Sequence, residues 1–333
     1  FLTSGREYLG LYHKSLQDWL LSESADDYMV DAFDGIKKIC DGCIQAYQES
    51  MNEMNKYELK YLIPYMEKTQ DQRIWQVLKN KEYADLLMKH ARMEAIAFRY
   101  DDATSLAEMA WYIYKNNHHF EDVALAGLFL AEVTDLMVCL EKSKKWCKDS
   151  LEVIKGDSSL IRTPLFGDIW MKLAYVYFRE GNWEKSVHGY KIAYEYYNKS
   201  KNVSENQREQ KKIEAMMMCA NALRNSTDYK EAIKLFQKIE TSFIYEKLKK
   251  TEVILYTNIL LHYGWTLHNA GNYRRAGEYL EQAERMLANT DLPLKDIAQV
   301  YYLRSVEWFN QADYSLAEKY CEKSLYYVKQ VYG

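Results

Sequence analysis

Hydrophobic residues recur every three to four positions along most of this chain, which is the spacing of amphipathic helices. Two such stripes occupy residues 169–200, on either side of the turn residues Gly181, Asn182 and Trp183. Their members are Trp170, Leu173, Ala174 and Tyr177 before the turn and Ser186, Tyr190 and Ala193 after it. The pattern predicts two antiparallel helices that approach closely at Ala174 and Ser186, because small side chains let helix backbones come together.

The aromatic residue after this turn recurs at Trp183, Tyr229, Tyr273 and Tyr314, at intervals of 46, 44 and 41 residues. Small or apolar residues follow at three, seven and ten positions after most of them: Ser186, Tyr190 and Ala193; Ala232, Phe236 and Ile239; Ala276, Leu280 and Ala283; Ala317, Cys321 and Ser324. A pattern held through four units predicts a stack of helical hairpins. Together with the W-x2-L-G-x2-Y spacing of Trp170 to Tyr177, it resembles the tetratricopeptide repeat. The period exceeds the usual length of about 34 residues, so we expect longer helices or connections.

Few residues in this chain break helices, since it has 3 Pro and 13 Gly among 333 residues, and no strand-like alternation persists after residue 20. We therefore expect an all-α fold with a tetratricopeptide-like superhelix, an α-solenoid, over residues 79–333. It should contain about six hairpins, the last four being the clearest. Stripes around Leu106 and Ser150 mark the two earlier ones. Loop and cap signals separate the later hairpins at Thr163-Pro164, at Ser204 to Gln207 and at residues 291–293.

The first 24 residues contain a short extended run that passes into a helix. Because a single strand cannot form a sheet, we expect either that the partners of the run from Tyr8 to Tyr12 lie before residue 1 or that this end is irregular or frayed. The stretch from Leu11 to Leu20, LYHKSLQDWL, resembles the last strand and helix of the winged-helix module in NACHT-type ATPases of the STAND class. Their usual form is aromatic-x-His-x-Ser-Phe-Gln-Glu-aromatic-Leu, from which Leu16 and Asp18 depart mildly. The resemblance implies that residues 1–24 are the end of such a module and that His13 contacts the β-phosphate of ADP in the whole protein.

A second stretch resembles the same ATPases in the same order. Residues 57–66, YELKYLIPYM, are similar to the Tyr-x-Leu-x-Tyr-Leu-Pro-x-His-Leu helix that follows the winged helix, with Tyr65 in place of the usual His. A possible cap at Ser24 and Asp27 and a helical stripe from Val30 to Tyr47 precede it, so we expect residues 25–78 to form a helical arm.

The resemblance implies a parent protein whose nucleotide-binding domain, a partner of this chain, uses ADP or ATP with Mg. No G-x-x-x-x-G-K-[ST] motif occurs in the 333 residues, so we expect this chain itself to hold no cofactor.

Charge and cysteine use narrow the range of partners. A net charge of -4 provides no basic footprint for nucleic acid, and no apolar run approaches the length of a membrane span, so we expect neither nucleic acid nor a membrane as a partner.

The six cysteines lie mostly inside helical patterns, which is how reduced cytosolic thiols are distributed, and we expect a cytoplasmic location. Nothing at the start resembles a signal peptide, and we expect the chain to be part of a longer protein.

No set of catalytic residues stands out, so we expect a module that is not an enzyme. Cys40 and Cys43 form a single CxxC without a second pair, which favours two small residues of a helix over a metal or redox site. His118 and His119 lack the HExxH spacing and lie in a predicted turn. We expect no metal site.

A stack of helical hairpins presents a concave groove lined by the first helix of each hairpin, and we expect this groove to bind a protein or peptide ligand. The candidate residues are Tyr175, Phe178 and Arg179; Asn221, Arg224 and Asn225; His262, Trp265, His268 and Asn269; and Phe309 and Asn310. Asn225, Asn269 and Asn310 share one repeat position, where amides can grip the main chain of an extended peptide. Arg179 and Arg224 can pair with carboxylates.

Other interpretations remain open at these positions and for the whole chain. The asparagines could be polar residues that end a helix near a turn, and Trp265 and Phe309 could pack between repeats. We expect the ligand-sensing part of a STAND-type switch, in which ligand binding releases autoinhibition and permits oligomerisation. The alternatives are a constitutive scaffold and a bacterial peptide-responsive regulator.

Overall fold

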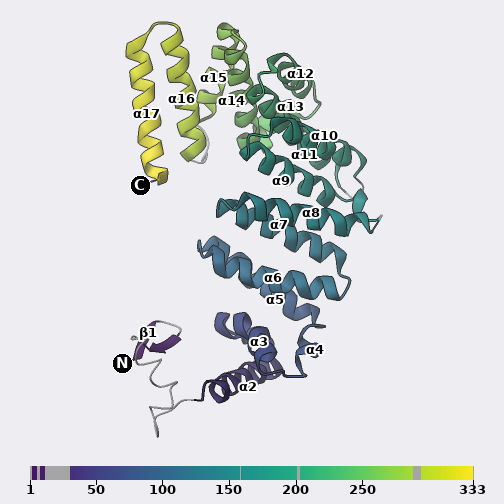
Figure 1. The fold of residues 1–333 in the computed structure, drawn as a ribbon. Helices are drawn as coiled ribbons and strands as arrows, with labels where there is room; N and C mark the ends of the chain where they lie inside the picture. The colour runs from purple at the N-terminus through teal and green to yellow at the C-terminus, as the bar shows by residue number, and fades with distance from the viewer. Residues whose placement is uncertain are drawn as a thin grey trace. The chain divides into compact units, whose positions relative to one another are not determined.

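The structure is a computed structural model that describes residues 2–5, 8–11, 31–157, 159–200, 203–287 and 294–332. The chain divides into two compact units, unit 1 (Phe1–Val153) and unit 2 (Ile154–Gly333). Helices make up most of both units (Figure 1), which confirms the predicted all-α class. His13, Ser24, Asp27 and residues 291–293 lie outside the described residues.

Unit 1 begins with two short strands and continues as a series of helices. In chain order they are β1 (Leu2–Gly5), β2 (Tyr8–Leu11), α2 (Ala32–Ser50), the 3-10 helix η2 (Met51–Glu53), α3 (Lys56–Lys68), α4 (Ile74–Val77), α5 (Lys81–Ile96), α6 (Tyr100–Asn116), α7 (Phe120–Leu136) and α8 (Leu140–Lys155), within which the unit ends. Asn55 and Glu58 form a capping box at the start of α3, which contains the whole stretch 57–66. The helical reading of that stretch is therefore confirmed.

The two strands correct one prediction. β2 contains the expected extended run, but its partner is β1, which lies just upstream within the chain rather than before residue 1. The strands pair antiparallel, with Leu2 opposite Leu11 and Gly5 opposite Tyr8. Antiparallel strands need only a short connection, so residues adjacent in sequence can supply the partner.

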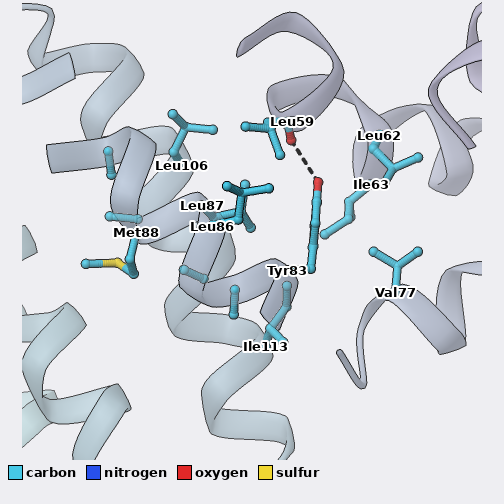
Figure 2. Close-up of a cluster of buried hydrophobic side chains, with 14 of the residues drawn as sticks. Leu59, Leu62, Ile63, Val77, Tyr83, Leu86, Leu87, Met88, Leu106 and Ile113 are labelled. Carbon is cyan, nitrogen blue, oxygen red and sulfur yellow. Dashed lines mark hydrogen bonds between the residues drawn. The ribbon is translucent and has the colours of Figure 1, made fainter. Parts of the chain in front are cut away.

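One hydrophobic core joins the helices α2 to α6. Tyr83 of α5 is fully buried, and its hydroxyl donates a hydrogen bond of 3.0 Å to the carbonyl of Leu59 in α3 (Figure 2). Its ring meets Tyr47 of α2 edge-on, with 5.6 Å between the ring centroids. Leu87 of α5 and Leu106 of α6 belong to the same cluster. The helices before residue 79 thus pack as one body with the hairpin that follows them.

Unit 2 contains four hairpins in succession. Its elements are the 3-10 helix η3 (Leu160–Arg162), α9 (Pro164–Arg179) with α10 (Trp183–Lys199), α11 (Glu205–Asn225) with α12 (Tyr229–Glu240), α13 (Tyr245–Thr251), α14 (Val253–Asn269) with α15 (Tyr273–Leu287), and α16 (Leu294–Asn310) with α17 (Tyr314–Tyr332). The four marker aromatics are each the first residue of a second helix, as predicted. The 21-residue α11 and the inserted α13 account for part of the long period.

The helices approach closely where the sequence predicts small residues. Ala174 of α9 and Ser186 of α10 are fully buried. A Cβ added to Gly189 of α10 would lie only 2.8 Å from the Cβ of Ala174. A Cβ added to Gly264 of α14 would lie 3.2 Å from the carbonyl oxygen of Ala276 in α15. These small residues therefore set the spacing of the two helices within their hairpins.

The turns inside the hairpins of unit 2 share one backbone arrangement. Each contains a residue with positive φ, namely Gly181, Thr227, Gly271 and Ala312. The N–H of the following residue bonds back to the last turn of the first helix, as Asn182 does to the carbonyl of Tyr177 at 2.9 Å. The side chains of Asn182, Asp228 and Asp313 then cap the second helices of their hairpins, accepting from the N–H groups of Lys185, Glu231 and Leu316. In these three turns the same Asn or Asp bonds to the end of the first helix and caps the start of the second. The last residues of each first helix therefore lie at fixed positions relative to the turn.

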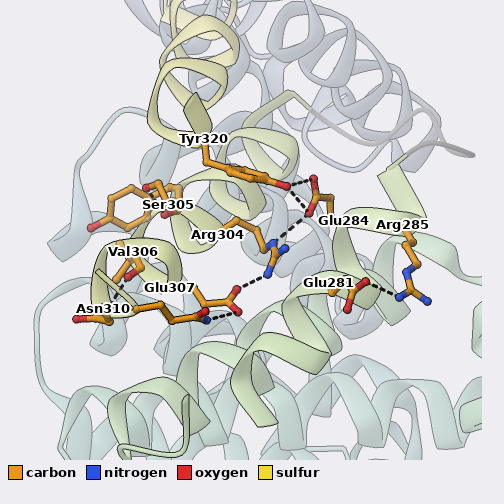
Figure 3. Close-up of polar contacts among 11 residues, drawn as sticks. Glu281, Glu284, Arg285, Arg304, Ser305, Val306, Glu307, Asn310 and Tyr320 are labelled. Atoms are coloured by element: carbon orange, nitrogen blue, oxygen red, sulfur yellow. Dashed lines mark hydrogen bonds and ion pairs between the residues drawn. The ribbon is translucent and has the colours of Figure 1, made fainter. Parts of the chain in front are cut away.

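A buried polar network links the last two hairpins of unit 2 (Figure 3). Arg304 of α16 donates to Glu284 of α15 through Nε at 3.0 Å and to the carboxylate of Glu307 through Nη1. Tyr320 of α17 donates to Glu284 at 2.9 Å. Gly277 makes room for Glu307, because a Cβ there would lie 2.3 Å from Oε1 of Glu307. The network is structural, since all its charged groups are paired with one another.

Two motifs singled out in the sequence have structural positions in unit 1. Cys40 and Cys43 are buried in α2, and burial is the main cause that raises the pKa of the Cys43 thiol to about 11. Such a thiol is a poor nucleophile, which agrees with the interpretation as packing residues. His118 has a φ of 59° in the turn between α6 and α7, where the sequence places it, and His119 precedes the first residue of α7.

Candidate functional site

The candidate residues lie at fixed positions relative to the positive-φ residue of each turn in unit 2. Three positions before it stand Phe178, Arg224, His268 and Phe309, and two positions before it stand Arg179, Asn225, Asn269 and Asn310. Tyr175, Asn221 and Trp265 occur six positions before it, and His262 nine. They belong to the ends of the four first helices α9, α11, α14 and α16. We call the surface that these twelve residues form the first-helix face.

Three of the four residues at the first of these positions pack against the aromatic of their own turn. The rings of Phe178 and Trp183 lie 5.1 Å apart, those of His268 and Tyr273 5.1 Å apart, and those of Phe309 and Tyr314 5.5 Å apart. All three contacts are edge-on. Phe178, His268 and Phe309 therefore have a structural task within their own hairpins.

Arg224 occupies the same position but reaches the next hairpin instead. Its guanidinium lies over the indole ring of Trp265 in α14, 3.8 Å from the ring centroid. Its Nη1 lies 3.5 Å from Nδ1 of His262, also in α14. Because an arginine can only donate, Nδ1 of the neutral His262 ring is the acceptor. The structure thus brings together Arg224, His262 and Trp265 from two successive first helices.

Arg224 is buried without a carboxylate partner in the described part of the chain. Only 4% of it is exposed, and its Nε makes no hydrogen bond there. Asn221, one helical turn earlier in α11, is 3% exposed and leaves Oδ1 without a donor. Burial lowers the pKa of Arg224 to about 10, so the guanidinium stays charged at neutral pH. A buried charge that has only a ring face and a neutral imidazole beside it lacks the anion that such a group normally pairs with.

His262 is held in its neutral form by the same surroundings. Burial and then the positive charges of Arg224 and Lys295 lower its pKa to about 3. In the unfolded chain the ring would titrate near its ordinary value of about 6.5. Between these two values the unfolded state binds a proton that the folded state does not, so His262 makes folding less favourable as the pH falls below about 6.5.

The His262→Gln variant is therefore expected to lose part of the acid sensitivity of the wild type. Its melting temperature should fall less than that of the wild type between pH 7 and pH 4.5, because glutamine does not bind a proton in either state. Differential scanning calorimetry over this range measures the difference. His188→Gln, on the exposed side of α10, is the matched control and should follow the wild-type profile. Equal profiles for the wild type and His262→Gln would contradict the neutral buried His262.

The asparagines near the turns differ from one another. Asn310 donates through Nδ2 to the carbonyl of Val306 at 2.9 Å and to Nε2 of His268 at 3.1 Å, so it both ends α16 and touches α14. The side chains of Asn225 and Asn269 make no hydrogen bond within the described residues. The turn interpretation therefore applies to Asn310, whereas Asn225 and Asn269 keep free amide groups one repeat apart.

The remaining predicted residues lie around α9. The rings of Tyr175 and Phe178 are parallel, with centroids 6.4 Å apart, and Arg179 is exposed at the end of the same helix. The two arginines that the sequence groups as carboxylate partners thus lie in different surroundings, one exposed and one buried.

The described ranges contain neither a candidate metal site nor a candidate membrane-spanning helix. No three His, Cys, Asp or Glu side chains there come together in a way that could hold a metal ion. No helix of these ranges is both long and apolar enough to cross a membrane.

Comparison with known proteins gives structural likenesses alone, since no family model matches the chain and no curated protein matches it in sequence. The apo form of RapI has a TM-score of 0.56 at 14% identity, covering 89% of this chain and 98% of RapI. NprR in complex with its cognate peptide NprX has a TM-score of 0.53 at 12% identity, over 89% of this chain and 79% of NprR. The repeats of a kinesin light chain from Podospora anserina have a TM-score of 0.51 at 14% identity, covering 64% of this chain and 99% of the kinesin light chain structure.

The fold is tetratricopeptide-like. All three solved structures are arrays of the repeat type that the sequence pattern predicts, and the first of them matches over nearly its whole length. The predicted fold class, an all-α tetratricopeptide-like solenoid, is therefore confirmed. The likenesses concern the path of the helices and do not transfer any residue of the first-helix face.

Proposed function

We propose that unit 2 is a non-catalytic recognition module that binds an extended peptide, free or as part of a protein, on its first-helix face. The observation that carries the proposal is the pair of unpaired amides, Asn225 and Asn269, at the same position of successive repeats. Each amide offers a donor and an acceptor, which is what the main chain of an extended peptide needs along one edge. A peptide that crosses the ends of α11 and α14 can therefore bond to both.

The structural likenesses support a peptide as the ligand. NprR, which resembles this chain in fold, is a protein solved with its cognate peptide. A second similar structure is a Rap protein complexed with Competence and Sporulation Factor, with a TM-score of 0.52 at 12% identity. The fold of this chain thus suits peptide binding, and the unpaired amides give it the means.

We further propose that the module is the sensor of a STAND-type ATPase, in which ligand binding releases autoinhibition and permits oligomerisation. What supports this part is the pair of resemblances at residues 11–20 and 57–66, the strand β2 at the start of the first, and the helix α3 that contains the second. In the whole protein His13 would then contact ADP in the missing nucleotide-binding domain. The switch requires that the ligand bind the open state more tightly than the closed one.

The coding sequence upstream of residue 1 tests this second part separately. A Walker A loop and an acidic Walker B strand are expected there. A start codon close to residue 1, or an unrelated domain, would leave a peptide-responsive regulator or a scaffold, with the recognition by unit 2 unaffected.

Replacing Asn225 and Asn269 together by alanine is expected to weaken peptide binding without unfolding unit 2. The probe is a 12-residue peptide selected from a random display library on the full chain. Each lost amide contact removes about 0.5–1.5 kcal/mol, so the dissociation constant should rise roughly 5- to 100-fold. Calorimetric titration measures it, and the melting temperature should change by only a few degrees.

The matched control is the double variant Asn198→Ala and Asn206→Ala, which removes two exposed amides from α10 and α11 away from the helix ends in question. It should bind the selected peptide like the wild type. If instead the Asn225 and Asn269 variant melts far below the wild type, the two amides are structural residues of the turns, and the proposal loses the observation on which it rests.

A further inference from the structure

The buried Arg224 calls for a partner that the described chain does not supply. Its guanidinium is covered on one face by Trp265 and meets only a neutral ring, His262, at its edge. The other buried arginine of the described residues, Arg304, pairs with two carboxylates, those of Glu284 and Glu307. Arg224 is thus the exception among the buried arginines of unit 2.

The position of Arg224 in its repeat points the same way. At the three equivalent positions an aromatic or imidazole ring packs on the marker aromatic of its own turn. Arg224 instead lies over the ring of Trp265 in α14, although leaving a charge buried without a carboxylate costs free energy. A side chain that destabilises the unliganded fold in this way is characteristic of a binding site.

We propose that Arg224 and Asn221 form a specificity site for a carboxylate of the bound peptide. The carboxylate pairs with the guanidinium, and the free Oδ1 of Asn221 accepts a hydrogen bond from a neighbouring main-chain N–H of the peptide. The inference rests on the proposed function and names the chemical class that the first-helix face selects.

A carboxylate fits this site for geometric and electrostatic reasons. Two donors of a guanidinium match the two oxygens of a carboxylate, while Trp265 fixes the plane in which they point. His262 and Trp265 are partly exposed whereas Arg224 is not, so the carboxylate approaches along these two side chains. Since His262 is neutral and accepts from Arg224, it does not compete with the incoming anion as a second carboxylate would.

The carboxylate can come from an Asp or Glu side chain or from the free C-terminus of the peptide. The experiment uses the library-selected peptide in three forms: with a free C-terminus, with an amidated C-terminus, and with each Asp and Glu replaced by Asn and Gln. One of these neutralisations is expected to weaken binding to the wild-type chain by about 10- to 100-fold. If amidation weakens binding, the carboxylate is the C-terminus of the peptide; if replacement of Asp and Glu weakens it, the carboxylate is a side chain.

The variant Arg224→Met should lose this discrimination and bind the acidic and neutralised peptides equally weakly. Its melting temperature should equal or exceed that of the wild type, because methionine covers Trp265 without a buried charge. Arg179→Met, an exposed arginine of the same face, is the control and should keep the preference. Arg224→Lys keeps the charge but not the planar fork, and should keep only part of the preference.

Several outcomes would overturn the proposal. One is that neutralised peptides bind the wild type as tightly as acidic ones, which would show recognition without a carboxylate. Another is that Arg224→Met still prefers the acidic peptide. A third is that Arg224→Met melts well below the wild type, as a packing residue would. In all three cases the effect of Asn225 and Asn269 on binding can persist, so failure here is distinct from failure of the proposed function.

Discussion

Replacing Arg304 with methionine is expected to destabilise unit 2 by about 3–5 kcal/mol, because it removes the cation that pairs with the carboxylates of Glu284 and Glu307. Arg304 is 7% exposed and Glu307 5% exposed, and Figure 3 shows Arg304 between Glu307 and Glu284. Burial raises the pKa of Glu307 above its ordinary value even with Arg304 present. Without Arg304 this carboxylate must either take up a proton or remain charged without a counterion.

Thermal unfolding measures this effect as a fall of roughly 10 °C for a unit of this size. Arg285→Met, which breaks the exposed pair with Glu281, is the control and should leave the melting temperature nearly unchanged, because solvent screens an exposed pair. Adding Glu284→Gln and Glu307→Gln to Arg304→Met should restore much of the loss, since neither of these two side chains then carries a charge without a counterion. A melting temperature that is unchanged by Arg304→Met would contradict the network as a source of stability.

Replacing Tyr83 with alanine is expected to destabilise unit 1 by about 3–5 kcal/mol, since it leaves a cavity where α3, α2 and α5 meet. The ring is fully buried against Tyr47, and its hydroxyl bonds to Leu59 (Figure 2). Tyr83→Phe should cost only about 0.5–1.5 kcal/mol, because it removes the hydrogen bond but keeps the ring. Tyr112→Ala, at a half-exposed site of α6, is the matched control and should have little effect.

Amide hydrogen exchange of Tyr83→Ala also tests whether α2 to α6 share one core. If α2 to α6 share one cooperative core, the amides of α3 and of α5 should lose protection together in Tyr83→Ala. Loss of protection in α5 alone would show that the helices before residue 79 are an independent arm, separate from the first hairpin.

The hairpins could be predicted from the sequence because their signals are local. Trp183, Tyr229, Tyr273 and Tyr314 begin their helices as expected, and the capping box of Ser204 and Gln207 is present. An Asn or Asp immediately precedes each of the four marker aromatics, at Asn182, Asp228, Asn272 and Asp313. These two residue types are among the preferred N-caps, so this position is a local signal for the start of the second helix.

Elements that break the repeat were not predicted. Helix α13 lies between the second and third hairpins of unit 2, and its buried residues Tyr245 and Leu248 give too short a pattern to be separated from the end of a longer helix. The strand β1 was also missed, because four residues with little alternation carry no signal until their partner is known. Pairing between strands is a tertiary property that composition alone does not contain.

The candidate site shows the same division between local and distant information. The sequence places the asparagines and Arg224 on the first helices. It offers packing between repeats as an alternative for Phe309, whereas the structure shows a contact with Tyr314 inside its own hairpin. The sequence does not contain the finding that Arg224 has no carboxylate partner among the described residues, because each of the 48 acidic residues is a candidate partner until the fold is known. Partner choice across 20 residues, as between Glu284 and Arg304, depends on how the hairpins stack.

Amide hydrogen exchange of the full chain with and without the library-selected peptide tests the central proposal, peptide recognition by the first-helix face, most directly. The account predicts slower exchange in the C-terminal halves of α11 and α14, within residues 216–225 and 260–269, and little change in the second helices α12 and α15. Protection confined to α12, α15 or unit 1, or no change at saturating peptide, would contradict it.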